Sequence, residues 1–126
     1  MFLCPICREP LSPGKGALAC PKGHSFDMAA QGYVNLLPPN RKKSKEPGDN
    51  GEMLAARTRF LQTGAYQPLS DALNELLLSA CGTDCTVLDA GCGEGYYLSQ
   101  LGWVPERWGI DISRDAVRYA AARDRG

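Results

Sequence analysis

Hydrophobic residues recur every three or four positions between residues 69 and 77, which is the spacing of one face of an α-helix. We expect this helix to begin near Pro68 and to stop at Gly82, because proline is tolerated in a first turn and glycine ends helices. An earlier helix is expected to start at Asp49 or Asn50, either of which can cap it, and to reach about Thr63. The apolar positions of the second helix are Leu69, Ala72, Leu73, Leu76 and Leu77.

The pattern changes after residue 85. Residues 86–90 form a short apolar run that is typical of a buried strand, and a glycine-rich turn follows at residues 91–95. We expect a helix from about Glu94 to Leu101, a second strand over residues 107–112, and a final helix capped by Ser113. The order strand, helix, strand, helix predicts an α/β fold that opens a parallel sheet.

The first 37 residues form a different kind of segment. Prolines and glycines interrupt it so often that no long element is expected, and its few apolar residues make too small a core. A unit of this size needs a disulfide cross-link or a bound metal ion to stabilise it. We therefore divide the chain into a compact module at residues 1–37, a linker at 38–51 and an α/β region at 52–126.

The module carries four residues at metal-ligand spacing. Cys4 and Cys7 form a Cys-x2-Cys pair, twelve residues follow, and Cys20 and His24 form a Cys-x3-His pair. Two close pairs joined by a loop suit tetrahedral Zn²⁺, and four protein ligands leave no open coordination position. The sequence therefore predicts a structural zinc ion.

Three other interpretations of these cysteines stay open at this point. Cys-x-x-Cys can be a redox motif, although that motif needs a following helix, which residues 10–16 do not offer. The cysteines can also be ordinary core residues. They can, finally, form two disulfides, although no secretion signal accompanies them.

Charge separates along the chain although the net charge is zero. Residues 1–45 carry seven Lys and Arg against two acids, a net charge of +5, so the remainder carries −5. The basic part favours a polyanionic partner, and the run at residues 41–45 suits either RNA phosphates or a solvated linker. No apolar stretch is long enough for a membrane helix and no signal-peptide pattern is present, which points to a cytoplasmic location and no membrane partner.

The glycine-rich turn is the candidate cofactor site. Glycines such as Gly91 and Gly93 let the backbone approach a ligand closely, and amides at the start of the following helix can donate to it. Asp111 lies twenty residues beyond Gly91, at the end of the next strand. Nucleotide-binding α/β folds place an acid there to bind ribose hydroxyls.

The details of the turn favour S-adenosylmethionine over a dinucleotide. The glycines are spaced Gly-x-Gly-x-Gly, and Tyr96 occupies the place of the third glycine that a pyrophosphate site needs. Asp89 and Glu94 suit a ligand with ammonium and sulfonium groups better than one with phosphates. A tight strand–helix turn that binds nothing is the alternative interpretation.

Together these residues resemble the bacterial 23S ribosomal RNA guanine-N1 methyltransferases. The resemblance covers nearly the whole chain in order, and its stretch from His24 to Leu37 is more specific than either chemical motif. It includes both ligand pairs, residues 24–38, Pro47-Gly48-Asp49, Met53 to Arg57, Tyr66-Gln67-Pro68-Leu69 and the run from Leu88 to Tyr97.

The resemblance implies a zinc module that helps to recognise RNA, followed by a Rossmann-like class I methyltransferase domain. It implies methyl transfer from S-adenosylmethionine to guanine N1 in 23S rRNA. It also implies that Tyr66, Gly93 and Glu94 contact the cofactor and that Asp111 holds its ribose. No catalytic residue is assigned, and homodimer formation is left open.

Only two strands of the methyltransferase sheet are expected in this chain, which would make it the N-terminal portion of such an enzyme. The segments that would hold the adenine and the methyl-accepting base are then missing. We therefore expect the chain by itself to be inactive. The alternative function is that of a non-catalytic, zinc-dependent RNA-binding module.

Overall fold

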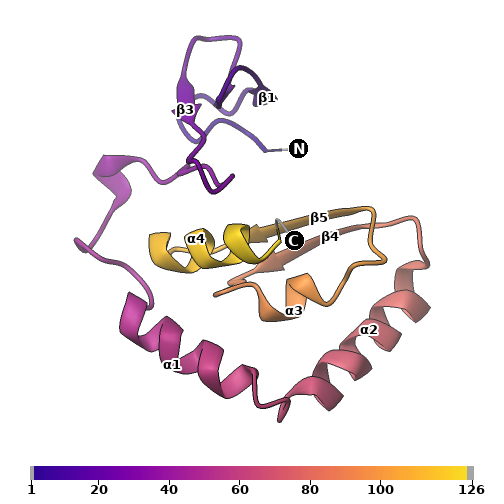
Figure 1. Ribbon diagram of the computed structural model, residues 1–126. Coiled ribbons are helices and arrows are strands. Elements are labelled where there is room, and N and C mark those ends of the chain that lie inside the picture. The colour runs from indigo at the N-terminus through magenta and orange to yellow at the C-terminus, as the bar shows by residue number, and fades with distance from the viewer. Residues whose placement is uncertain (1, 125–126) are drawn as a thin grey trace. The chain divides into compact units, whose positions relative to one another are not determined.

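The computed structural model describes residues 2–124 and divides into two compact units, the first ending at Pro47 and the second beginning at Gly48 (Figure 1). The last two residues of the expected α/β region, 125–126, lie outside the described part. Within residues 2–124 no helix combines the length and the apolar character that crossing a membrane requires. Each unit has its own sheet, and the two sheets differ in strand direction.

The first unit is built on a small antiparallel sheet. Its strands are β1 (Ser12–Pro13), β2 (Ala17–Ala19) and β3 (Ser25–Asp27), paired in the order β1-β2-β3. A short 3-10 helix, η1 (Pro39–Arg41), follows later in the unit. The strands stay at two or three residues, as the spacing of prolines and glycines predicts.

The core of the first unit is very small. Its fully buried residues are Cys4, Leu11 and Cys20, so two of the three are also candidate metal ligands. Burial of so little apolar surface cannot hold a unit of this length together without a further link. The half-buried residues packed around them are Phe2, Cys7, Leu18, Phe26 and Leu36.

Two helices open the second unit. In α1 (Gly51–Leu61) the Asn50 side chain accepts a hydrogen bond from the Met53 amide at 3.0 Å, which identifies Asn50 as the cap. In α2 (Gln67–Cys81) proline lies in the first turn and Gly82 follows the last residue, as predicted. The Trp103 indole donates to the Asn74 side chain at 2.7 Å and ties α2 to the segment that precedes the last strand.

The predicted parallel pair is present. Strands β4 (Thr86–Ala90) and β5 (Glu106–Ile110) run side by side, with Thr86 opposite Glu106 and Ala90 opposite Ile110. Helix α3 (Tyr96–Ser99) lies between them in the chain, and α4 (Arg114–Arg123) follows β5. The α/β order expected from the sequence is therefore confirmed.

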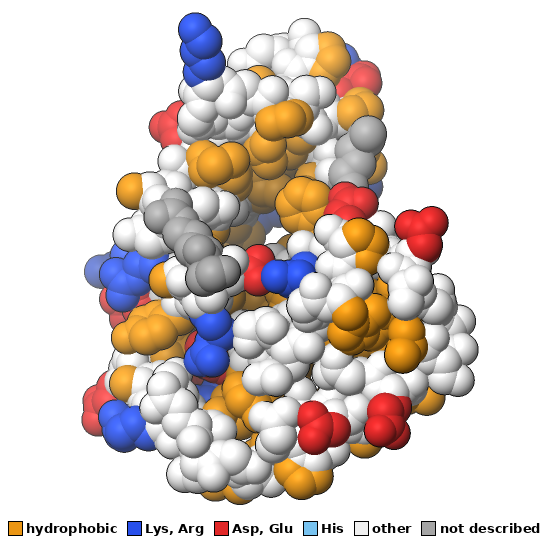
Figure 2. Space-filling view, turned by 45° about the vertical axis from the view of Figure 1, so that its right-hand side comes forward, with side chains coloured by type: hydrophobic (Ala, Val, Ile, Leu, Met, Phe, Trp, Pro, Cys, Tyr) orange, Lys and Arg blue, Asp and Glu red, His pale blue; other side chains and the backbone are white. Residues whose placement is uncertain are grey.

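The two faces of this pair have different environments. On one face Val87 packs against Leu98, Leu101 and Val104, which form the buried core of the unit. Leu88 and Trp108 are opposite each other on the other face, where they are 55% and 38% exposed. Figure 2 shows hydrophobic side chains exposed on the surface in several patches between the charged ones.

Several boundaries differ from the sequence prediction. Helix α1 ends at Leu61 and α3 at Ser99, each about two residues before the predicted end. Helix α3 begins at Tyr96 and not near Glu94, because Gly95 has a φ of +82° and cannot continue a right-handed helix. Strand β5 ends at Ile110, two residues before the predicted end. Asp111 therefore lies just beyond the strand, where the chain turns toward α4.

We expect Gly95→Ala to destabilise the chain more than the matched substitution Gly64→Ala. Both glycines have left-handed backbones, with φ values of +82° and +80°, so either alanine adds roughly 1–2 kcal/mol of strain. A Cβ at Gly95 would lie 2.9 Å from the Ala120 Cβ, whereas one at Gly64 would meet nothing within 4 Å. Overpacking should add about 1–3 kcal/mol at Gly95 alone. Urea unfolding measures the free energy of unfolding of each variant. An equal decrease in both variants would show that Ala120 can move aside without a loss of stability.

Candidate zinc and cofactor sites

Two similar turns present the four candidate metal ligands of the first unit. The Arg8 amide donates to the Cys4 carbonyl at 2.9 Å, and the Gly23 amide donates to the Cys20 carbonyl at 3.0 Å. Arg8 and Gly23 both have left-handed backbones, with φ values of +66° and +84°. Each turn therefore folds its ligand pair back toward a common point.

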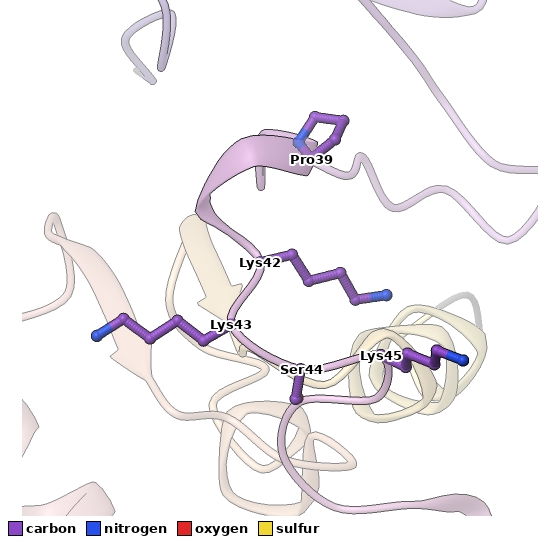
Figure 3. Close-up of a pocket in the computed structure, with 5 residues that line it drawn as sticks. All are labelled: Pro39, Lys42, Lys43, Ser44 and Lys45. Carbon is purple, nitrogen blue, oxygen red and sulfur yellow. The ribbon is translucent and has the colours of Figure 1, made fainter.

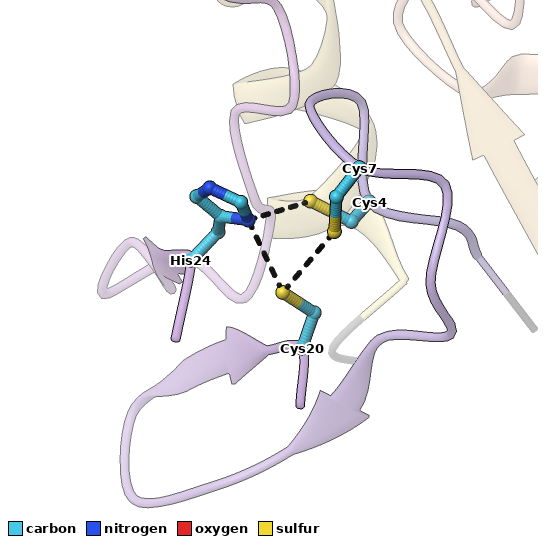
Figure 4. A group of neighbouring side chains, drawn as sticks. All are labelled: Cys4, Cys7, Cys20 and His24. Atoms are coloured by element: carbon cyan, nitrogen blue, oxygen red, sulfur yellow. Dashed lines mark hydrogen bonds between the residues drawn. The ribbon is translucent and has the colours of Figure 1, made fainter. Parts of the chain in front are cut away.

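The four ligand atoms meet at zinc-like separations (Figure 4). Sγ of Cys4 lies 3.6 Å from Nδ1 of His24, and Sγ of Cys20 lies 3.3 Å from the same nitrogen. Sγ of Cys7 lies 3.6 Å from Sγ of Cys20, and all four atoms lie within 4.8 Å of one another. Bonds of about 2.3 Å to sulfur and 2.0–2.1 Å to nitrogen put the corners of a tetrahedron roughly 3.5–3.8 Å apart. The donor set therefore fits one zinc ion.

The structure weakens the competing interpretations of these cysteines. Among the described residues no helix follows Cys7 before η1, so the helix that a thioredoxin-like redox motif needs is missing. All six cysteines are free thiols, and the 3.6 Å between Cys7 and Cys20 is far longer than a disulfide bond. Cys4 and Cys20 are indeed core residues, but their burial in one cluster does not prevent them from binding a metal ion.

In the second unit, β5 holds the glycine loop at the carboxyl end of β4. The Gly91 amide donates to the Ile110 carbonyl at 2.8 Å. Oδ2 of Asp111 accepts the Gly93 amide at 2.9 Å, and Oδ1 of the same carboxylate accepts the Ser113 amide at 2.8 Å. Asp111 therefore joins the loop to the residue that caps α4.

The loop leaves room for a ligand at its first two glycines. A Cβ placed on Gly91 or Gly93 would meet nothing within 4 Å, and the φ values of these residues are +92° and +56°. Asp111 is half-buried, and each of its oxygens can accept more than the one amide bond that it already has. Backbone and carboxylate can thus both be reached from the open side of the loop.

Negative charge gathers at the same end of β4. Burial raises the pKa of the Asp89 carboxyl, and the nearby charge of Asp111 raises it further. Burial, followed by the charges of Asp89 and Asp111, raises the pKa of the Cys92 thiol to about 11. A cationic ligand would be favoured here, because it would offset the repulsion between the two carboxylates.

Glu94 has a different environment from the other two acids. Its side chain is 2% exposed and forms an ion pair with Arg123 of α4, and its carboxylate also accepts the Tyr96 amide at 3.2 Å. Arg123 additionally donates to the Glu94 carbonyl at 3.2 Å. Sequence reasoning missed Arg123 because it lies 29 residues away and belongs to no motif. The geometry makes Glu94 a residue that fixes the loop to α4 and gives its carboxylate little access to a ligand.

Tyr66 lies at the start of α2. Its ring packs edge-on against Phe60, with centroids 5.4 Å apart, and is 41% exposed. The next residue, Gln67, accepts a hydrogen bond from the Tyr96 hydroxyl at 3.3 Å. The start of α2 therefore contacts α3, although the Tyr66 ring itself contacts α1.

The chain is similar to known proteins in both of its units. Residues 2–45 match a zinc-ribbon family described as "RlmA, N-terminal". Over 94% of its length the chain is 41% identical to the 23S rRNA (guanine(748)-N(1))-methyltransferase of Streptomyces fradiae, of which it covers 43%. The first unit is thus a zinc ribbon whose metal site consists of Cys4, Cys7, Cys20 and His24.

Two other relatives are named for the same guanine-N1 methylation of 23S rRNA. The chain is 40% identical to a Micromonospora griseorubida protein over 94% of its own length and 46% of the relative. It is 36% identical to YxjB of Bacillus subtilis over 96% of its own length and 45% of the relative. The chain spans less than half the length of the curated relatives that it matches.

We expect purified chain to carry one zinc ion, and Cys20→Ser to lose it, because serine cannot replace a thiolate ligand. Cys81→Ser is the matched control and should keep the zinc, since Cys81 lies outside the cluster. Chelation should unfold the first unit, because metal binding and folding are coupled in such small modules. The far-UV helical signal should largely remain, since α1 to α4 all belong to the second unit. Elemental analysis without zinc, or equal zinc in both variants, would contradict this assignment.

Proposed function

We propose a function for the complete protein, on the premise that residues 2–45 match the RlmA N-terminal zinc ribbon and that the chain resembles guanine-N1 methyltransferases over less than half of their length. The complete protein transfers a methyl group from S-adenosylmethionine to N1 of a guanine in 23S rRNA. In this proposal the zinc ribbon contacts the RNA and the glycine loop holds the methyl donor. The observation that carries it is the Asp111 carboxylate bound to the Gly93 amide beside an open loop, in a chain that begins with this zinc ribbon.

Three features of the loop support S-adenosylmethionine as the ligand. Asp111 is placed to accept hydrogen bonds from ribose hydroxyls, because each of its oxygens keeps lone-pair capacity. Gly91 and Gly93 leave space for a close approach of the ligand. Asp89 adds negative charge that favours a cationic ligand over a diphosphate.

Other residues hold this arrangement in place. The buried pair of Glu94 and Arg123 fixes the loop to α4, and we assign it a positioning role. Gly95 allows the close packing against Ala120. A contact of Tyr66 with the cofactor is also part of the proposal, by the family resemblance, and its ring is 41% exposed.

The bound cofactor supplies an electrophilic methyl group on a positively charged sulfur. The protein's task is to align guanine N1, the methyl carbon and the sulfur. Guanine N1 carries a proton and is hidden in a base-paired helix, so the base must be unpaired or flipped and must lose that proton. We assign no proton acceptor among the residues of this chain.

The basic end of the first unit is the proposed contact with RNA phosphates. Pro39, Lys42, Lys43, Ser44 and Lys45 line a shallow, open hollow. In the view of Figure 3, Lys42 and Lys45 extend to one side of the segment and Lys43 to the other. Such a spread of ammonium groups suits the phosphates of a curved strand better than a single bound anion.

A non-catalytic, zinc-dependent RNA-binding module is the second candidate for the 126-residue chain by itself. It is favoured by the zinc ribbon and the basic run at residues 41–45, which can contact RNA phosphates without a methyl donor. Calorimetry separates the two candidates. Binding of a 23S rRNA hairpin without S-adenosylmethionine binding would favour the module.

The function is tested by incubating the full-length protein with S-adenosylmethionine and 23S rRNA hairpin fragments, followed by mass spectrometry of the nucleosides. We expect N1-methylguanosine at one guanine and none when that guanine is replaced by adenine. The replacement removes the acceptor position and keeps the backbone contacts. Methylation at another atom, or none with a folded, zinc-loaded enzyme, would refute the proposed reaction.

We expect Asp111→Ala in the full-length protein to weaken S-adenosylmethionine binding by about 1.5–3 kcal/mol, the scale of hydrogen bonds to a charged group. Asp84→Ala is the control, because Asp84 is an exposed acid that precedes β4 and should leave the affinity unchanged. Asp111 also accepts two backbone amides, so Tm is measured for each variant to separate lost binding from lost folding. Equal affinity in the wild type and Asp111→Ala would show that another acid binds the ribose.

A further inference from the structure

Two thiols outside both proposed sites lie unusually close together. Cys81 is the last residue of α2, and Cys85 directly precedes β4. Their Sγ atoms are 2.8 Å apart, whereas a disulfide bond measures roughly 2.03–2.05 Å. A displacement of less than about 1 Å therefore separates this dithiol from bonding distance.

The local structure keeps the two thiols in this position. Gly82, with a φ of +69°, reverses the chain directly after α2 and its amide donates to the Leu78 carbonyl at 2.9 Å. The Cys81 thiol donates to the Leu77 carbonyl at 3.0 Å. Cys85 is half-buried and packs against the core of Leu98, Leu101 and Val104. The turn after α2 and the packing of Cys85 against this core therefore hold the two sulfurs close together.

We propose that Cys81 and Cys85 are a modification site, at which exchange with a low-molecular-weight disulfide forms a reversible intramolecular disulfide. The bond closes a five-residue ring from Cys81 to Cys85 and fixes the end of α2 to the start of β4. It thereby limits the motion of the strand that carries Asp89. The proposal does not depend on the methyltransferase assignment.

The thiol–disulfide exchange takes place in two steps. Cys81, the more exposed of the two, loses its proton to water, and its thiolate attacks one sulfur of the small disulfide and releases one small thiolate. Cys85 then loses its proton, and its thiolate attacks Sγ of Cys81 and releases the second small thiolate. The two electrons from the protein thiols reduce the small disulfide to two thiols.

The other four cysteines provide internal controls. Cys92 is buried and its pKa is raised to about 11, chiefly by burial, so it is expected to react very slowly with disulfides. Cys4, Cys7 and Cys20 belong to the zinc cluster and stay protected in zinc-replete buffer. Selective loss of Cys81 and Cys85 reactivity is therefore the signature of the proposed site.

The test equilibrates the zinc-loaded chain with glutathione buffers that run from fully reduced to fully oxidised. Free thiols are then alkylated, and the tryptic peptide 60–107, which holds Cys81, Cys85 and Cys92, is examined by mass spectrometry after a second protease. We expect a Cys81–Cys85 disulfide in oxidised buffer, with Cys92 still alkylatable after denaturation. Dithiothreitol should restore both thiols.

Variants and stability provide the second measurement. The oxidised chain should have a Tm several degrees above the reduced chain, because the link restricts the unfolded state. The Tm of Cys81→Ser/Cys85→Ser should not respond to the buffer, and either single variant should carry one glutathione at the remaining cysteine. Full alkylation of Cys81 and Cys85 in oxidised glutathione would overturn the proposal. So would two glutathione adducts without ring closure.

Discussion

The arrangement of the glycine loop and of α4 in the second unit depends on the carboxylate of Asp111. Asp111 accepts the Gly93 amide with one oxygen and the Ser113 amide with the other, at 2.9 and 2.8 Å. Removing these acceptors would leave two half-buried amides without partners, at a cost of about 1–3 kcal/mol each. The Ser113 side chain in turn caps α4 by accepting the Ala116 amide at 3.1 Å and donates to the Asp49 carbonyl at 2.6 Å. The glycine loop, α4 and the segment before α1 are therefore connected through neighbouring residues of one turn.

The first unit is constrained in another way. Cys4 and Cys20 supply both its buried core and half of its metal site, so packing and ligation cannot be separated there. Burial brings the thiols together, and four donors at zinc-like spacing supply the link that so small a core lacks. The RlmA zinc-ribbon match over residues 2–45 agrees with this account. A positively charged segment at residues 41–45 completes the unit that we propose for RNA contact.

Local patterns predicted most of the elements, and long-range contacts account for what they missed. Asn50 and Ser113 were recognisable as caps because capping depends on residues only three positions apart. The start of α3 was placed too early, because Gly95 has a left-handed backbone and packs closely against Ala120 on α4, a contact that no local pattern reveals. For the same reason the pairing of Glu94 with Arg123 could not be foreseen. The ligand cluster was predictable because the Cys-x2-Cys and Cys-x3-His spacings are those of zinc-binding turns.

The central claim is that the loop at Gly91–Gly93 and the Asp111 carboxylate form the binding site for S-adenosylmethionine. Amide NMR of the isotopically labelled full-length protein, titrated with S-adenosylmethionine, tests it most directly. The account predicts that the amides of Gly91, Gly93 and Ser113 shift first and by the largest amounts, because the first two line the open side of the loop and the last two donate to Asp111. Saturable shifts elsewhere in the protein, with these three amides unchanged, would contradict it.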